Sequence, residues 1–329
     1  MPVQLSTEWT YRGFTAIMLE NELLRVVILP QLGAKIWSII DKRRDVELLW
    51  HHPRVAVRAA PFGAAYDDWF VGGWDELFPN DAPVEINGER YPDHGELWSL
   101  PWDWSVVEQA RDEVTVALRH AGIVTATQVE KRITLRAGEP LLHIDLHIHN
   151  AGPQPLDFLW KLHPALHVTP NSRIDMPAGR VEIDPSFRAR LGALESFRWP
   201  HAPLANGAQI DMRRIPPFED QACDLYYAVE LEDGWCALTD TAARAGFGLV
   251  FDKAVFNTVW VFGAYGGWRG LYTTILEPCT GYPYRLDEAI ARGTASRLDA
   301  GAELRTALTA VVYHGVDSVN RLTHAGEVA

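Results

Sequence analysis

The sequence predicts an all-β protein folded as one large antiparallel β-sandwich. Short segments in which apolar and polar residues alternate recur along the 329-residue chain, and such alternation is typical of half-buried strands. Gly, Pro, Asn and Asp separate these segments at short intervals, as they do between the strands of a sandwich. The chain contains no internal repeat, low-complexity tract or charged linker. We therefore expect a single domain over residues 1–329.

The first strands are expected in the N-terminal third of the chain. Residues 23–40 have the pattern of two strands around a turn at Gly33. Residues 84–91 place Asn87 and Gly88 between two short strands, where a tight hairpin turn requires positive φ. Both segments predict antiparallel pairs.

Three later segments also predict strands. Residues 113–120 alternate apolar with polar or small side chains, and residues 142–150 do so most clearly, with Leu and Ile on one face and His and Asp on the other. Residues 273–276 predict a strand that ends at Pro278, because proline has no N–H for the ladder. Glu277 is then either a solvated residue at a strand end or a positioned acid–base group.

One helix and two long loops complete the expected fold. Residues 285–293 have helical periodicity, with Gly293 as the stop signal. The Pro-rich residues 199–207 and 213–220 are expected to be surface loops. Loops over one face of a sandwich are where such a scaffold carries a site.

Composition limits the function. Hydrophobic residues make up 47% of the chain and include 13 Trp, 12 Phe and 10 Tyr, which is enough for a sizeable core. Charged residues, at 22%, exclude a disordered chain. The net charge of -13 would repel phosphate backbones. We therefore expect neutral polar small molecules as ligands and no nucleic-acid partner.

The cysteines and the N-terminal residues predict a cytoplasmic protein. The three cysteines are odd in number and share no C-x-x-C spacing, which favours a reducing compartment. They are Cys223, Cys236 and Cys279. Residues 1–13 lack a signal-peptide pattern, and no apolar run approaches the roughly 20 residues of a membrane helix. No membrane partner is expected, and the oligomeric state stays open.

Two motifs suggest a sugar site. GGWDELFPN begins with two glycines, which allow close backbone approach, and continues with Trp74, Asp75 and Glu76. Aromatic rings stack on the C–H faces of sugars, while carboxylates accept hydrogen bonds from their hydroxyls. PDHGELWSLPW places His94 before bulky apolar residues, in what we expect to be a ligand-facing loop. Trp74 and Trp102 could equally belong to the core.

Two groups of histidines raise other possibilities. The polar face of residues 143–149 holds three histidines and an aspartate, a set that suits zinc or iron. Four ligands along one straight strand, at roughly 3.3 Å per residue, span too far to enclose one ion, so we expect a solvated face and no metal. His163 and His167 lie in an apolar segment, where a histidine is usually a hydrogen-bonded core residue. The sequence contains no serine-hydrolase elbow or phosphate-binding loop.

Taken in order, several segments resemble the galactose mutarotase-like family, the aldose 1-epimerases. The resemblance covers most of the chain, and it depends on the order and spacing of motifs that are each moderately specific. These motifs are NELLRVVILPQLGAKIWSI, GGWDELFPN, HGELWSLPW, FLWKLHPAL, ACDLYYA and ILEPCTG. The resemblance implies the β-supersandwich fold of that family.

The resemblance also implies roles for four residues. By position, His163 is similar to the general acid of the family and Glu277 to its general base, while His94 and Asp224 are similar to residues that position the substrate. Such an enzyme opens the sugar ring by taking the proton of the anomeric hydroxyl and giving one to the ring oxygen. Glu277 would be ionised near neutrality and His163 could hold the proton. No cofactor or metal is implied.

The sequence departs from the family pattern in two places. Val71 stands where the hexose-phosphate branch has an arginine, which weakens the case for a phosphorylated substrate. A Pro-Ala-Leu sequence follows His163 where typical members have an aromatic pair, so His167 is an alternative acid. Three basic residues could bind an acidic sugar or simply lie on the surface, namely Lys161, Arg269 and Arg285.

Three other functions stay open. A glycoside hydrolase or lyase would need a second carboxylate near Glu277, with Asp224 or Asp75 as candidates. A non-catalytic sugar-binding or sensor protein would use the same residues only for affinity. A metal-dependent isomerase would use the histidines of residues 143–149.

Overall fold

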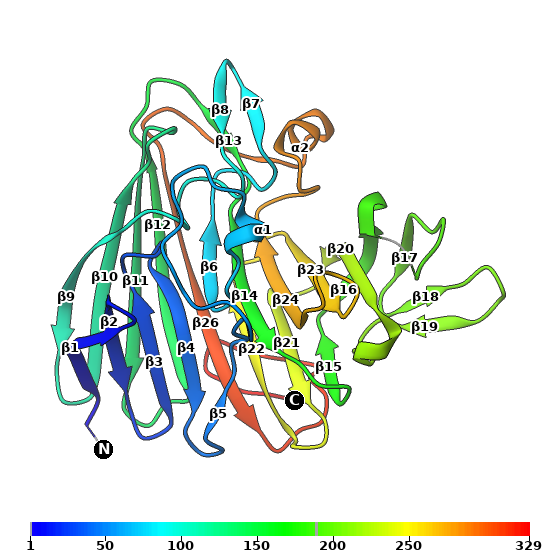
Figure 1. The fold of residues 1–329 in the computed structure, drawn as a ribbon, viewed down its shortest axis with the longest axis horizontal. Helices are drawn as coiled ribbons and strands as arrows, with labels where there is room; N and C mark the ends of the chain where they lie inside the picture. The colour runs from blue at the N-terminus through cyan, green and yellow to red at the C-terminus, as the bar shows by residue number, and fades with distance from the viewer. Residues whose placement is uncertain (1, 188–189) are drawn as a thin grey trace.

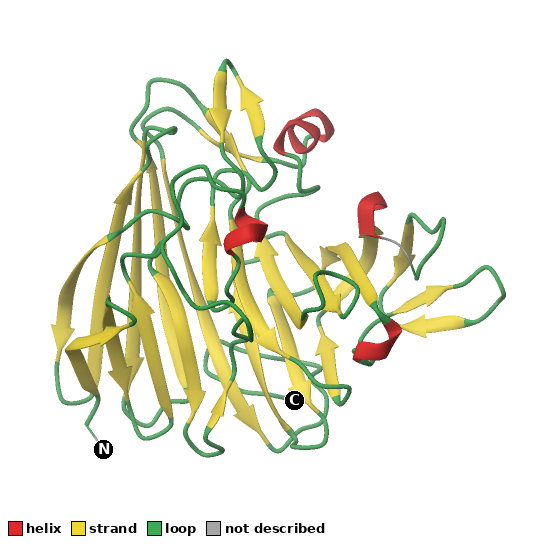
Figure 2. Ribbon diagram, viewed as in Figure 1, coloured by secondary structure: helices red, strands yellow, loops and turns green. Residues whose placement is uncertain are grey.

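Two large antiparallel sheets, packed face to face, make up most of the fold (Figure 1; Figure 2). The structure, a computed structural model, describes residues 2–187 and 190–329. One sheet has 12 strands and the other has eight. Buried side chains from both sheets form one continuous core. The predicted all-β class and the antiparallel sandwich are confirmed.

The 12-stranded sheet begins at the N-terminus and contains the strands that later carry the candidate site. Its strands, in spatial order, are β1 (Gln4–Tyr11), β2 (Phe14–Glu20), β3 (Leu24–Leu29), β4 (Lys35–Asp41), β6 (Trp74–Leu77), β14 (Lys161–His167), β24 (Tyr272–Cys279), β23 (Thr258–Tyr265), β20 (Ala222–Leu231), β16 (Ala178–Ile183) and β17 (Ser196–Arg198), with β5 (Val46–Glu47) beside β4.

The eight-stranded sheet covers the other side of the core. Its strands, in spatial order, are β15 (Ser172–Asp175), β21 (Trp235–Asp240), β22 (Ala245–Phe251), β26 (Glu303–His314), β12 (Leu141–Asn150), β11 (Thr127–Arg136), β10 (Glu113–Ala121) and β9 (Asp103–Gln109). Three two-stranded sheets pair β7 (Val84–Ile86) with β8 (Glu89–Tyr91), β13 (Leu156–Phe158) with β25 (Ser296–Leu298), and β18 (His201–Pro203) with β19 (Gln209–Asp211).

Helices are few. The predicted helix is α2 (Leu286–Arg292), and it ends at Gly293, whose φ is 70° and whose N–H bonds back to the last turn. A second helix, α1 (Tyr66–Trp69), was not predicted because it is a single turn. The 3₁₀ turns are η1 (Pro185–Phe187) and η2 (Phe218–Asp220). Among the described residues, no helix combines the length and apolar character that a membrane crossing needs.

The predicted turns and strands agree well with the structure. Gly33 (φ 68°) lies between β3 and β4, and Asn87 (φ 53°) with Gly88 (φ 86°) joins β7 to β8. In β12 the Leu and Ile side chains are buried and the alternate side chains are more exposed. In β10 the alternation is lost over residues 114–118, which are all buried.

Two expectations about proline were wrong. Residues 199–207 do not form a plain loop, since β18 and β19 form a hairpin there. β24 also continues beyond Pro278, which pairs with Val259 of β23, so Glu277 lies inside the strand rather than at its end. Proline interrupts only the other side of the strand, where the β14 to β24 pairing has a gap between Ile275 and Cys279.

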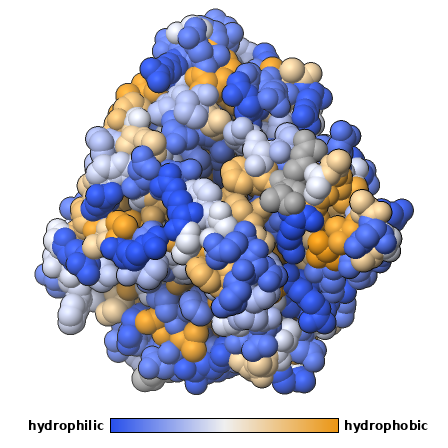
Figure 3. All heavy atoms as spheres, turned by 45° about the vertical axis from the view of Figure 1, so that its right-hand side comes forward, coloured by the Kyte–Doolittle hydropathy of each residue, from blue (hydrophilic) through white to orange (hydrophobic). Residues whose placement is uncertain are grey.

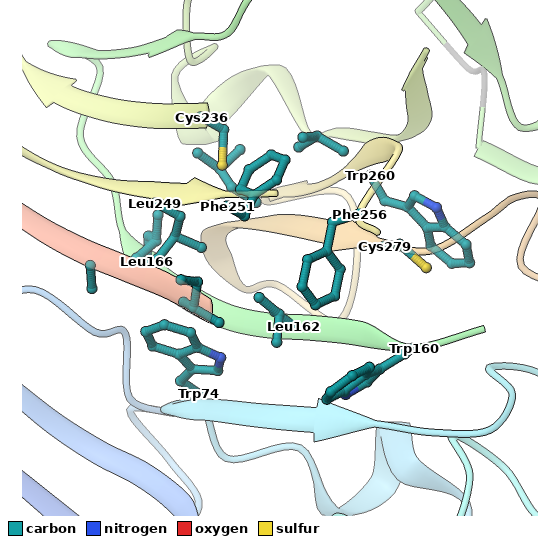
Figure 4. Packing of buried hydrophobic residues seen from close by; sticks show 14 of the residues in the cluster. Trp74, Trp160, Leu162, Leu166, Cys236, Leu249, Phe251, Phe256, Trp260 and Cys279 are labelled. Carbon is teal, nitrogen blue, oxygen red and sulfur yellow. The ribbon is translucent and has the colours of Figure 1, made fainter. Parts of the chain in front are cut away.

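A buried ion pair joins the two sheets. The Lys131 ammonium lies 2.6 Å from the Glu76 carboxylate, and both side chains are 1% exposed. Lys131 also donates to the carbonyl of Ala34 at 3.0 Å. Trp74 lies nearby in the core (Figure 4), with its ring edge-on to Phe247 of the opposite sheet. The charges of Lys131 and Glu76 are paired only when the two layers are together.

Replacing Lys131 by Met is expected to destabilise the fold by about 3–5 kcal/mol, because it leaves the Glu76 carboxylate buried without its cation. The free energy of unfolding, measured by urea denaturation, checks this change. The double variant Lys131→Met with Glu76→Leu removes both charges and should recover most of the lost stability. A double variant as unstable as Lys131→Met alone would contradict the account of this pair.

Candidate active site

Five neighbouring strands of the 12-stranded sheet present one set of side chains to a common face. Successive side chains of a strand alternate between the faces, and paired residues of adjacent strands share a face. Asp75 of β6 pairs with His163 of β14. Glu277 of β24 pairs with Trp260 of β23, and Phe262 pairs with Leu225 of β20. The register therefore brings these residues together although they are far apart in the sequence.

A cavity of about 290 Å³ opens on this face. Its lining combines aromatic and charged side chains. The aromatic lining includes Phe70, Phe187, Trp260, Phe262, Trp268 and Tyr284, and the polar lining includes Tyr66, Asp67, Asp81, Asp93, His94, Lys161, His163 and Glu277. Figure 3 turns the right-hand side of Figure 1 towards the viewer, and it shows hydrophobic patches among hydrophilic residues on this part of the surface. Such a mixed lining suits a ligand with both C–H faces and hydroxyls.

Lys161 is the central cation of the cavity. Its ammonium lies 2.8 Å from the Glu277 carboxylate and also binds Asp81. It lies 4.5 Å from the centre of the Trp260 ring, within the range of a cation–π contact. Burial opposes the charge of Lys161, but the two carboxylates raise its pKa above the usual value. Lys161 therefore stays charged and is already neutralised by protein groups.

Glu277 is 1% exposed, and burial raises the pKa of its carboxyl group to about 7 despite the opposing effect of Lys161. His163 lies beside it, with Nε2 4.0 Å from Glu277 Oε2. Burial, together with the charges of Lys161 and His94, lowers the pKa of His163 well below 6.5. The sequence led us to expect an ionised Glu277 beside a protonated His163, and burial shifts both groups towards their neutral forms.

His94 lies at the cavity wall in a loop, with φ 58°. Its Nδ1 is 2.9 Å from Asp93, its Nε2 is 3.6 Å from Asp81, and its ring stacks on Tyr66 at 4.1 Å. Burial alone would lower the pKa of His94, but Asp81 and Asp93 raise it above 6.5. His94 is thus suited to donate hydrogen bonds as a cation.

Three of the predicted site residues face away from the cavity side of the sheet. Trp74 and Glu76 flank Asp75 on β6 and therefore face the core between the sheets. Asp224 precedes Leu225 on β20 and faces away from the cavity, where it forms an ion pair with Arg190 at 2.5 Å. Strand alternation explains all three placements. We no longer assign sugar contacts to these residues.

Asp75 faces the same side as His163 but lies beneath the cavity. Its carboxylate is 2% exposed and accepts hydrogen bonds from Lys35 at 2.5 Å and Tyr66 at 2.8 Å. Tyr66 in turn lies 3.1 Å from Nδ1 of His163. Asp75 is therefore a support of the site rather than part of its lining.

The remaining histidines lie elsewhere. His167 is exposed at the end of β14 and does not line the cavity, so His163 is the histidine that meets Glu277. On β12, His143 pairs with Glu139 at 2.8 Å and His147 with Glu303 at 3.2 Å. Within residues 2–187 and 190–329, no group of three or more His, Cys, Asp or Glu is arranged to hold a metal ion.

Sequence reasoning missed several residues of the cavity. Asp93 precedes His94 and Asp81 ends the run FPND, so both were adjacent to motifs that drew attention. Tyr66 belongs to a one-turn helix in a loop and carries no comparable signal. The aromatic wall, with Trp268 and Phe262, depends on strand register rather than on a motif.

Solved structures share this fold. A galactose mutarotase-like protein from Clostridium acetobutylicum aligns with a TM-score of 0.68 at 13% identity, over 95% of this chain and 99% of that one. A proposed aldose 1-epimerase from Klebsiella pneumoniae subsp. pneumoniae aligns with a TM-score of 0.74 at 14% identity, over 95% and 83%. The galactose mutarotase related enzyme from Lactobacillus acidophilus aligns with a TM-score of 0.60 at 16% identity, over 93% of this chain and 100% of that one. At these identities the likeness establishes the galactose mutarotase-like fold.

A family model covers most of the same sheets. The model described as Domain of unknown function (DUF5107) matches residues 4–227, which is more than half of the chain. This span includes β6 and β14, with Asp75, Lys161 and His163, but ends before Glu277. By this match, the chain belongs to the DUF5107 family.

Proposed function

We propose that the protein is an aldose 1-epimerase that interconverts the α and β anomers of a sugar. The observation that carries this proposal is a buried carboxyl and a buried imidazole, 4.0 Å apart in one cavity. Burial raises the pKa of Glu277 to about 7 and lowers that of His163, so that the pair holds one proton below about pH 7. That is the number of protons that ring opening needs.

The reaction uses one proton acceptor and one donor. The acceptor takes the proton of the anomeric hydroxyl, the bond from the anomeric carbon to the ring oxygen breaks, and the donor protonates that oxygen. The two reacting oxygens are bonded to the same carbon, so a closely spaced pair can reach both. After rotation of the freed aldehyde, the reverse transfers close the ring and restore the pair.

The charges of the cavity favour a neutral sugar. Lys161 is bound by Glu277 and Asp81, and His94 lies between Asp93 and the same Asp81. The two arginines considered for an acidic sugar are also paired, Arg269 with Asp68 at 3.0 Å and Arg285 with Asp287 at 2.7 Å. An anionic substrate would have to displace these partners. The aromatic wall offers a stacking surface for the C–H face of a neutral ring.

The rival functions find less support in the geometry. The two carboxylates considered as a second catalytic acid for glycoside cleavage are both held elsewhere, Asp75 beneath the cavity and Asp224 on the opposite face. A sensor protein would have no need of an acid–base pair that retains one proton. Product analysis separates cleavage from epimerisation, because epimerisation leaves the sugar intact.

Glu277→Gln and His163→Asn are each expected to slow anomer exchange by about 10²–10⁴-fold, because each removes one proton-transfer group. Exchange between α and β anomers, followed by NMR on a panel of neutral, acidic and phosphorylated sugars, measures this effect and identifies the substrate. His167→Asn is the matched control, since this exposed histidine of the same strand should leave the rate unchanged. Binding of a sugar by calorimetry without accelerated exchange for any member of the panel would favour the sensor function instead.

The rate of anomer exchange is expected to fall as the pH rises through about 7, the pKa of Glu277. Because burial raises this pKa, the pair keeps its proton up to that pH and loses it above. The pH profile of kcat/KM, corrected for buffer-catalysed exchange at each pH, checks this. A rate that stays constant up to pH 9 would contradict the assignment of the proton to this pair.

A further inference from the structure

A chain of three buried side chains supports His163 from beneath. The side chains are Tyr66 from α1, Asp75 from β6 and Lys35 from β4, and each is no more than 5% exposed. Tyr66 Oη lies 3.1 Å from His163 Nδ1 and 2.8 Å from Asp75 Oδ2. The Lys35 ammonium lies 2.5 Å from the same Asp75 oxygen and 3.0 Å from the carbonyl of Gly72. Ring opening by itself requires only His163 and Glu277, so these three supporting side chains need a separate explanation.

The hydrogen bonds of the chain fix one proton on His163. Tyr66 has a single hydroxyl proton, and the carboxylate of Asp75, in an ion pair with Lys35, can only accept. The hydroxyl therefore donates to Asp75 and offers its lone pair to His163. Nδ1 of His163 must then carry the proton that forms the remaining hydrogen bond. In a neutral imidazole this leaves Nε2 without a proton.

The order of the chain also keeps His163 neutral. A carboxylate bonded directly to an imidazole stabilises the imidazolium form. Here the Tyr66 hydroxyl separates Asp75 from His163, and Lys35 neutralises the carboxylate. The chain therefore orients the ring without attracting a second proton. The nearby cations Lys161 and His94 also disfavour a second proton, because they lower the pKa of His163.

We propose that Tyr66, held by Asp75 and Lys35, is a positioning residue that makes His163 the proton acceptor of the pair and Glu277 the donor. This inference rests on the proposed epimerase function and reverses the roles that the family resemblance implies. The proton of the anomeric hydroxyl passes to His163 Nε2, and the carboxylic acid of Glu277 protonates the ring oxygen. The electron pair of the broken carbon–oxygen bond goes to the ring oxygen, while the anomeric carbon becomes an aldehyde.

A pH profile cannot distinguish the two assignments, because the pair holds one proton in both. The location of the proton can be measured directly by ¹⁵N NMR of histidine-labelled protein, with His163→Asn used to assign the signal. We expect neutral His163 with the proton on Nδ1. A proton on Nε2 in the wild-type protein would overturn the inference, whatever the activity.

Two variants test the chain itself. Tyr66→Phe keeps the ring that stacks on His94 but removes the hydroxyl, and Asp75→Asn lets the amide donate to Tyr66 so that the hydroxyl can turn towards His163. Both should move the His163 proton towards Nε2 and lower kcat by about tenfold to a hundredfold with less effect on KM. Tyr265→Phe, which removes another buried hydroxyl that bonds Thr274, is the control and should change neither.

The outcomes separate the inference from the proposed function. If Nδ1 carries the proton but no sugar is epimerised, the positioning chain stands and the epimerase function fails. If sugars are epimerised but Tyr66→Phe leaves the tautomer and kcat unchanged, the epimerase function stands and the role of Tyr66 is wrong. Should Tyr66→Phe fail to fold, the wild-type spectrum and Asp75→Asn still decide the question.

Discussion

Pairing of β14 with β6 on one side and β24 on the other is the constraint on which the candidate site depends. It places His163 beside Asp75 and brings Lys161 next to Glu277. A shift of either pair by one residue would turn these side chains into the core between the sheets. The buried charges that result are tolerable only because each has a partner of opposite sign. The sheet register thus determines both the chemistry and the electrostatic balance of the cavity.

Burial has a different effect on each charged group of the cavity. Lys161 remains a cation because two carboxylates surround it, and Asp81 and Asp93 do the same for His94. Glu277 shares the cation of Lys161 with Asp81, and its pKa rises to about 7. His163 is buried near the cations Lys161, His94 and Lys35, so its pKa falls. A glutamate and a histidine have ordinary pKa values of about 4.3 and 6.5. In this cavity the pKa of Glu277 is the higher of the two.

The sequence allowed the fold and part of the site to be predicted. Alternating strands, the Asn87-Gly88 turn and the helix before Gly293 are local patterns, and the structure agrees with them. His163, His94 and Glu277 were found by resemblance and Lys161 was considered for an acidic sugar, and all four line one cavity.

The errors have a common physical origin. Trp74 and Glu76 were grouped with Asp75 because they are adjacent, but a strand sends neighbours to opposite faces. Asp224 was assigned through the family resemblance, and it faces away from the cavity and pairs with Arg190. Tyr66, Lys35 and Asp81 come from separate elements, and only tertiary packing brings them to the site. Proton positions depend on burial and on hydrogen-bond direction, which no single segment of the sequence encodes.

The most direct test of the central claim is the protonation of Glu277 itself. Infrared difference spectra between the wild-type protein and Glu277→Gln isolate the C=O band of this carboxylic acid, which can be followed across the pH range. A band that disappears as the pH rises through about 7 is predicted by the buried pair that holds one proton. A band that is lost near pH 4.3, the ordinary range of a solvated glutamate, would contradict it.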